Sequence, residues 1–237
     1  QSPENQIATD KVWHELAFGL ESLGYDTPII RRRVAEMASF FGIQTWFYKP
    51  VTELSGGQKQ LLNLASVMVL QPKVLILDEP TSQLDPIAAS DFLATLGKIN
   101  RELGTTIILT EHRLEEAFGF ASRVAAMDKG TLLCTGTPAE VGAELKSSGN
   151  AMFLAMPAAM RIWAATDSKA ACPVSVCDGR NWLLDYAKTH KLQSVPEESK
   201  NAPDTETVVS AQELWFKYEK DLPDVVKGLS LELHTGE

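Results

Sequence analysis

One short segment constrains the fold more than any other: four aliphatic residues run directly into two adjacent carboxylates. Val74–Leu77 is wholly apolar, and Asp78 and Glu79 follow it without a spacer. Such a run is typical of a strand that is buried on both faces of a parallel sheet. Because ligands of open α/β sheets bind beyond the carboxyl ends of the strands, we expect both acids at a ligand site. A solvated acidic turn is the alternative, which the abrupt change from aliphatic to acidic residues disfavours.

Further strands and a helix extend this unit. A helical pattern over residues 86–102 leads to the apolar run Thr106–Leu109. Residues 123–127 are a third candidate strand, which turns at Lys129-Gly130 into residues 131–134. Strand, helix and strand joined by short loops predict a doubly wound α/β unit.

The end of the second strand adds a histidine to the same edge of the sheet. Thr110, Glu111 and His112 close that strand, so His112 is expected near Asp78 and Glu79. One acid of the pair can hold Mg²⁺ through water, and the other can orient or deprotonate an attacking water. An imidazole beside them can hydrogen-bond a terminal phosphate. A lone histidine is more often structural, but the shared edge favours the functional interpretation.

Two further segments lie at junctions between a loop and a helix. In Leu54–Gln58, Ser55 can cap a helix. Gly56 and Gly57 let a ligand approach the backbone closely. The positive end of the helix dipole at this point favours an anion as that ligand. A glycine-rich helix start without a ligand is the alternative. The segment Ser82–Asp85 precedes Pro86 and is explained equally well as a plain helix cap.

Composition excludes several classes of protein. The 237 residues carry a net charge of -9, which argues against a basic nucleic-acid footprint. Three cysteines form no disulfide framework, and Cys172 and Cys177 lack the partners of a structural zinc site. The most apolar stretch, residues 151–165, is interrupted by Pro157 and Arg161, so any membrane role requires a partner.

Taken in order, these motifs resemble the ATP-binding-cassette (ABC) transporter ATPases. The matches are Leu54–Gln58 with the signature, Val74–Glu79 with the Walker B strand, Ser82–Asp85 with the D-loop, His112 with the switch histidine and Gln1 with the Q-loop glutamine. The resemblance implies ATP and Mg²⁺ as cofactors. It covers residues 1–141 in one register.

The resemblance also implies a role for each matched residue. Asp78 would serve Mg²⁺, Glu79 would be the catalytic base, and His112 would sense the γ-phosphate. Gln1 would touch the metal and the attacking water. The remaining nucleotide-binding positions implied are Ser55, Gly56, Gly57, Gln58, Asp85 and Tyr218. In this family the signature completes the site of the opposite domain in a head-to-tail pair.

A narrower resemblance points to the energy-coupling-factor group of cobalt and vitamin importers. It is carried by Gln1–Ile7, Ala17–Glu21 and Glu111–Glu115, and by a helical appendage over residues 150–191. It implies an ATPase at the cytoplasmic face of the membrane that energises import of a vitamin or transition-metal ion. The partners implied are a transmembrane coupling subunit and a substrate-binding membrane subunit. Exposed aromatics such as Trp46 or Phe47 would line a docking groove, although core packing explains each equally well.

The tail resembles the start of a second cassette. Residues 208–218 and 225–233 read as β segments, and Tyr218 matches the aromatic that stacks on adenine, although an ordinary strand tyrosine is the alternative. The P-loop pattern Gly-x-x-x-x-Gly-Lys-[Ser/Thr] is absent. We expect one P-loop before Gln1 and another after Glu237, in a tandem two-cassette protein. The chain alone is then expected to be inactive, and its incomplete sheet to expose apolar surface and to self-associate.

The expected fold class is therefore α/β, a P-loop-NTPase-like cassette with a parallel sheet core and a helical subdomain, truncated before the Q-loop. The predicted divisions are the C-terminal part of a first ABC domain (1–148, helical subdomain about 8–70), the helical appendage (149–191), a linker (192–206) and the first strands of a second ABC domain (207–237).

Two other functions compete with an importer ATPase. A soluble tandem ABC ATPase could act on the ribosome or on nucleic acid, but the net charge of -9 argues against it, and no nucleic-acid partner is expected. A non-enzymatic scaffold with a degenerate cassette is the other, but Asp78, Glu79 and His112 are all present.

Overall fold

The structure is a computed structural model that describes residues 5–166, 168–190 and 206–236. It divides into two units, Gln1–His190 and Lys191–Glu237, each considered by itself. The predicted linker lies outside the described residues except for its last position, and Gln1 lies outside them as well. None of the described helices is long and apolar enough to cross a membrane.

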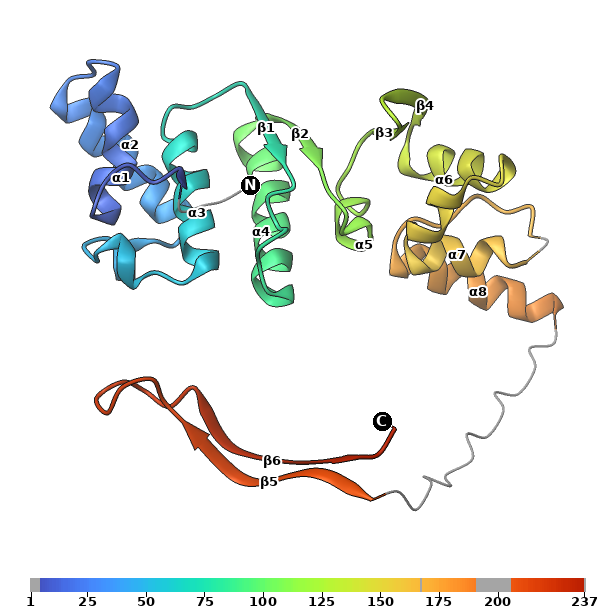
Figure 1. Cartoon of the computed structure of the whole chain (residues 1–237). Helices are drawn as coiled ribbons and strands as arrows, with labels where there is room; N and C mark the ends of the chain where they lie inside the picture. Colours follow the sequence, from blue (N-terminus) through green and yellow to red (C-terminus); the bar gives the residue numbers. More distant parts are fainter. Residues whose placement is uncertain (1–4, 167, 191–205, 237) are drawn as a thin grey trace. The chain divides into compact units, whose positions relative to one another are not determined.

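The first unit is mixed α/β, with helices at both ends and short strands between them (Figure 1). Its elements in chain order are α1 (Val12–Ser22), α2 (Thr27–Phe40), η2 (Gln44–Trp46), η3 (Val51–Glu53), α3 (Gly56–Met68), β1 (Val74–Asp78), α4 (Pro86–Lys98), η4 (Ile99–Leu103), β2 (Thr106–Thr110), α5 (Leu114–Ala117), β3 (Val124–Asp128), β4 (Thr131–Gly136), α6 (Pro138–Ser147), η5 (Ala151–Ala155), α7 (Ala158–Ala164) and α8 (Val176–Thr189).

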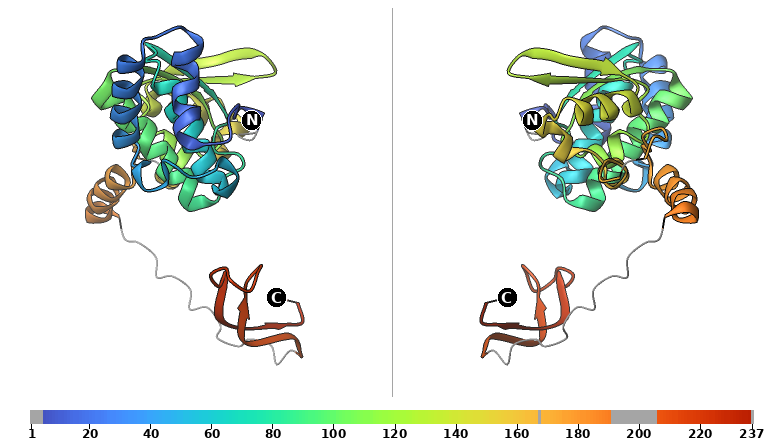
Figure 2. Two further views of the ribbon diagram at one scale, coloured as in Figure 1. Left: turned by 90° about the vertical axis from the view of Figure 1, so that its left-hand side faces the viewer. Right: turned by 90° about the vertical axis from the view of Figure 1, so that its right-hand side faces the viewer.

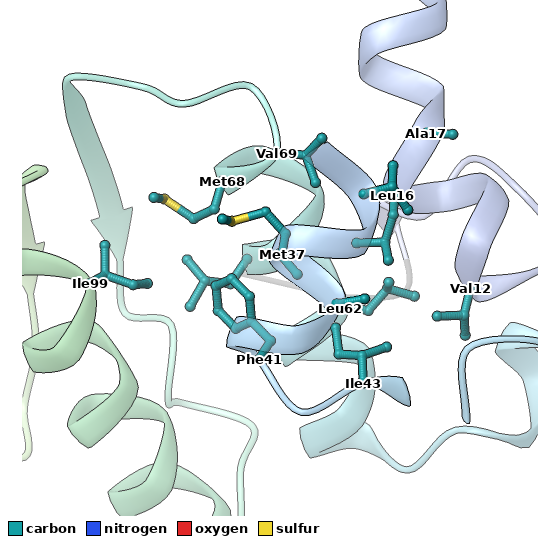
Figure 3. Packing of buried hydrophobic residues seen from close by; sticks show 14 of the residues in the cluster. Val12, Leu16, Ala17, Met37, Phe41, Ile43, Leu62, Met68, Val69 and Ile99 are labelled. Atoms are coloured by element: carbon teal, nitrogen blue, oxygen red, sulfur yellow. The ribbon is translucent and has the colours of Figure 1, made fainter. Parts of the chain in front are cut away.

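The first hydrophobic core lies among α1, α2, α3 and α4. Leu16 of α1, Met37 of α2 and Leu62 of α3 point toward one another, and Ile99 closes the side next to β1 (Figure 3). Trp46 belongs to this core with only 8% of its surface exposed. The prediction of an exposed docking aromatic is therefore wrong for Trp46, because η2 turns its ring inward.

The strands β1 and β2 pair in parallel, as predicted, with Asp78 opposite Thr110 at their carboxyl ends. The side chains alternate between the faces, so Leu75 packs into the first core, whereas Ile76 is 71% exposed. The prediction of a strand buried on both faces is wrong for this chain, because no described element covers the second face. The expected exposure of apolar sheet surface is confirmed.

The third candidate strand, β3, pairs with β4 in an antiparallel hairpin and not with β1 or β2 in the described residues. Lys129 and Gly130 form the predicted turn, and their φ angles of 47° and 78° match the left-handed geometry of a tight hairpin. Beyond it, α6, η5 and α7 enclose a second core with Phe118 and Met160. The segment predicted to be a helical appendage is helical.

The second unit is the hairpin of β5 (Thr207–Phe216) and β6 (Val226–His234). Figure 2 shows its two strands running side by side in a curved ribbon. Leu214, Trp215 and Val225 are all at least half exposed, so both of its faces carry uncovered apolar side chains. Two strands without a covering layer bury too little surface to be stable by themselves.

Candidate functional site

The carboxyl ends of β1 and β2 bring the predicted acids together. Thr110 Oγ1 donates a hydrogen bond of 2.6 Å to Asp78 Oδ1, across the register pair that ends the two strands. This bond orients one carboxylate oxygen and leaves the other available to a ligand. Thr110 was not singled out from the sequence, although its place at the end of the second strand is the same signal that selected His112.

Glu79 follows Asp78 in a backbone conformation that side chains rarely adopt. Its φ is 43°, which costs a non-glycine residue about 1 kcal/mol. Two contacts from Thr110 hold this turn, because the Glu79 N–H donates to both the carbonyl oxygen and Oγ1 of Thr110 at 3.1 Å. Backbone strain of this kind clusters at functional sites, although it also occurs in plain turns such as that at Lys129.

The turn places the Glu79 carboxylate against His112. His112 Nε2 lies 2.9 Å from Glu79 Oε1, although 33 residues separate them in the chain. The His112 side chain is 84% exposed and that of Glu79 is 34% exposed, so both groups are accessible to a ligand. An accessible carboxylate and imidazole in contact can orient and deprotonate a water molecule.

A second contact joins the loops that follow the two strands. The hydroxyl of Thr81, which is only 3% exposed, donates to Glu111 Oε1. The other carboxylate oxygen of Glu111 accepts the backbone N–H of His112 at 3.2 Å. Sequence reasoning missed Thr81 and gave Glu111 no role, because a pairing across 30 residues leaves no local signal.

The candidate signature residues form a separate feature at the start of α3. Ser55 Oγ accepts the N–H of Gln58 at 3.3 Å, and Gln58 Oε1 accepts the N–H of Ser55 at 3.0 Å. This reciprocal capping box confirms the predicted helix cap. The helix itself leaves the N–H groups of its first turn without carbonyl partners, so Gly56 and Gly57 present donors to an anion. Gln60 Nε2 donates to the Pro80 carbonyl at 2.9 Å, which ties α3 to the turn after β1.

Other predicted site residues lie apart from these two features. Asp85 caps α4, and its Oδ1 accepts the N–H groups of Ile87 and Ala88 at 3.0 Å. Tyr218 lies in the second unit, is 75% exposed and packs edge-on against Phe216. A ligand role stays a prediction for both.

No group of three or more His, Cys, Asp or Glu side chains in the described part of the chain is arranged to hold a metal ion by itself. A magnesium ion bound together with a nucleotide needs only one or two carboxylates, with waters and phosphate oxygens completing its shell. Asp78 has a free carboxylate oxygen beside the Thr110 hydroxyl and fits that requirement.

Comparison with known proteins agrees with these motifs. A family model described as ABC transporter matches residues 3–82. A protein of Bacillus cereus (strain ATCC 10987 / NRS 248), named as an ABC transporter ATP-binding protein, is 41% identical over 239 residues, which covers 100% of this chain and 42% of the relative. A protein of the same description from Clostridium tetani (strain Massachusetts / E88) is 34% identical over 94% of this chain and 48% of its own length. The chain thus spans less than half the length of these relatives.

Among solved structures, the chain is similar to cbiO1 from Clostridium perfringens, described as part of the ABC transporter complex cbiONQ. The TM-score is 0.57 and the sequence identity 36%, over 63% of this chain and 60% of cbiO1. Over that share of the chain, both the fold and the sequence therefore have a counterpart in a protein of known structure.

Proposed function

This chain belongs to the ABC transporter family, and from that premise we propose that it supplies catalytic and signature residues of an ATP-hydrolysing transport protein. The contact of 2.9 Å between Glu79 and His112 at the end of the parallel strands carries the proposal. It joins a general base to a hydrogen-bond donor at the place where a bound ligand meets the sheet.

In the proposed reaction each group acts on a different part of the substrate. Glu79 accepts a proton from the attacking water, and His112 donates a hydrogen bond to the γ-phosphate. Asp78 would hold Mg²⁺, which would supply positive charge against the phosphate oxygens when it is bound. Gln1 is proposed to contact the metal and the attacking water, and this part of the proposal rests on its match to the family motif alone.

The signature residues serve a second nucleotide in this proposal. Gly56 and Gly57 offer backbone donors at the start of α3, and Ser55 and Gln58 keep that first turn formed. We place them on the ATP of an opposite cassette, with Asp85 at the interface and Tyr218 stacked on adenine. A stretch with no P-loop lacks the main source of phosphate affinity, so the 237 residues alone are proposed to be inactive.

The similarity to cbiO1 supports a role in import. We propose that the full-length protein belongs to the energy-coupling-factor group and energises uptake of a vitamin or a transition-metal ion. It would bind at the cytoplasmic face of the membrane to a coupling subunit and a substrate-binding subunit. Docking would use Gln1–Ile7 and the helical region up to about Pro50, in which Tyr48 is 79% exposed.

The first experiment compares ATP turnover by the full-length protein and its Glu79→Gln variant. Loss of the base lowers kcat by about 100-fold or more, because general base catalysis supplies a factor of that order. The control is Glu102→Gln, which changes an exposed glutamate of η4. This variant is expected to hydrolyse ATP at the wild-type rate. Wild-type turnover by Glu79→Gln contradicts the proposed site.

Two companion measurements separate the remaining parts of the proposal. The 237-residue chain is expected to show no ATP turnover, and sustained hydrolysis abolished by Glu79→Gln would place the phosphates elsewhere. The full-length protein is expected to co-purify with a membrane subunit. Co-purification with ribosomes instead would support the tandem ATPase alternative.

A further inference from the structure

We propose that Glu115 is a positioning residue for His112, because its carboxylate fastens the segment after the histidine to the first turn of α7. The inference rests on the proposed function, since the reaction is the same. It also assigns a role to the helical appendage, which would act on the catalytic histidine through this contact.

The contact itself joins two distant segments. The backbone N–H of Ala158 donates a hydrogen bond of 2.9 Å to Glu115 Oε2, across 43 residues of chain. Ala158 is the first residue of α7, and Pro157 before it has no side chain that can cap a helix. Glu115 therefore supplies the acceptor that the local sequence lacks, and its charge is favourable at a helix N-terminus.

Apolar packing places Glu115 at this point. Leu114 and Phe118, on either side of it, both pack into the second core, and Phe118 is only 4% exposed. Met156 and Met160 of the appendage belong to the same core. α5 is thus bound to the appendage on its apolar side, and Glu115 adds the polar contact.

His112 needs such external support because little packs against its ring. Its side chain is 84% exposed, so its place beside Glu79 depends on where the backbone runs. On one side Glu111 is held by Thr81, and on the other Glu115 is held by Ala158. The histidine lies between these two anchors, one residue after the first and three before the second.

The space around the second anchor is not filled. A cavity of about 310 Å³ separates the two segments, lined by His112, Arg113 and Glu116 on one side and by Leu154 and Arg161 on the other. Side chains that face a cavity gain no close contacts there. On this side the hydrogen bond from Ala158 is the contact that adds to the apolar packing of α5, so its loss is expected to loosen the histidine segment.

The test removes the bond from either end in the full-length protein. Glu115→Ala deletes the acceptor. Ala158→Pro deletes the donor. The first position of a helix accepts proline, and the extended conformation of the preceding residue, with φ −47° and ψ 146°, is compatible with a proline after it. Each variant is expected to lower kcat about tenfold with KM for ATP unchanged, and the double variant no further. Glu115→Gln keeps an acceptor oxygen and is expected to restore most of the turnover.

The matched control is Glu144→Ala, which removes an exposed glutamate of α6 in the same part of the fold. Hydrogen exchange of the backbone amides of residues 111–117 gives a readout without ATP, and it is expected to quicken in Glu115→Ala and Ala158→Pro but not in Glu144→Ala. A kcat of Glu115→Ala equal to that of Glu144→Ala overturns the inference, and so do effects that multiply in the double variant. If Glu79→Gln also hydrolyses ATP at the wild-type rate, the proposed function has failed. If Glu79→Gln loses turnover and Glu115→Ala does not, the proposed function stands and only the role of Glu115 is overturned.

Discussion

The three cysteines show how burial sets the chemistry of single residues in this chain. Cys172 is buried in the second core, where Gly142 leaves room for its Sγ, and burial raises its pKa to about 11. Burial also raises the pKa of Cys134, whereas Cys177 is exposed at the start of α8. Only Cys177 is therefore accessible to a thiol reagent at neutral pH.

The raised pKa of Cys172 predicts a dependence of stability on pH. The folded protein favours the neutral thiol, so this contribution to stability is complete below pH 9.0, the ordinary value, and is lost as pH rises toward about 11. Urea denaturation between pH 8 and pH 11 should show a steeper loss of stability in the wild type than in Cys172→Ala. Cys177→Ala serves as the control and should follow the wild type. Parallel curves for all three proteins would contradict the assignment.

At the scale of elements, α3, α6 and α8 all begin with a capping box, and the first two of these form an informative pair. Ser55 and Gln58 form a capping box on α3, and Thr137 and Glu140 form one on α6. The hydrogen bonds from Thr137 lower the pKa of Glu140, which keeps that side chain ionised at the start of its helix. The two caps are alike in structure, but only the first is proposed to meet a nucleotide.

This pair separates a structural role from a functional one. Ser55→Ala and Thr137→Ala should each destabilise the full-length protein by about 1 kcal/mol, because each removes a helix cap. ATP turnover should fall in Ser55→Ala and stay near the wild-type value in Thr137→Ala. Equal turnover in the two variants would leave Ser55 with its structural role alone.

At the scale of the whole molecule, the sequence predicted what depends on neighbouring residues. The parallel pair, its acidic edge, the hairpin turn at Lys129 and the cap at Ser55 all follow from local patterns and are confirmed. Burial of β1 on both faces was wrong, because an apolar run does not say what covers it. The contacts of Thr81 and Ala158 were missed, since each pairs residues that are 30 or more positions apart.

The uncovered face of the β1–β2 pair predicts how the chain behaves in solution. Val74, Ile76 and Ile108 are each at least half exposed on it, and apolar sheet surface of this kind favours association. Light scattering of the 237-residue chain should show self-association, which Ile76→Thr reduces. Ile87→Thr is the matched control, because Ile87 is 76% exposed but lies at the start of α4, away from the sheet. A monodisperse wild-type monomer would contradict this prediction.

The contact between α3 and α4 decides how substitutions in the signature should be interpreted. A methyl group added at Gly57 would lie 3.0 Å from Ala88 Cβ, whereas one added at Gly56 meets nothing within 4 Å in the described structure. Ala88 also donates to the Asp85 cap, so a side chain at Gly57 presses on the start of α4 as well as on any ligand. In a mutational scan, intolerance at Gly57 therefore combines packing with function, and Gly56 is the position that reports on the ligand alone.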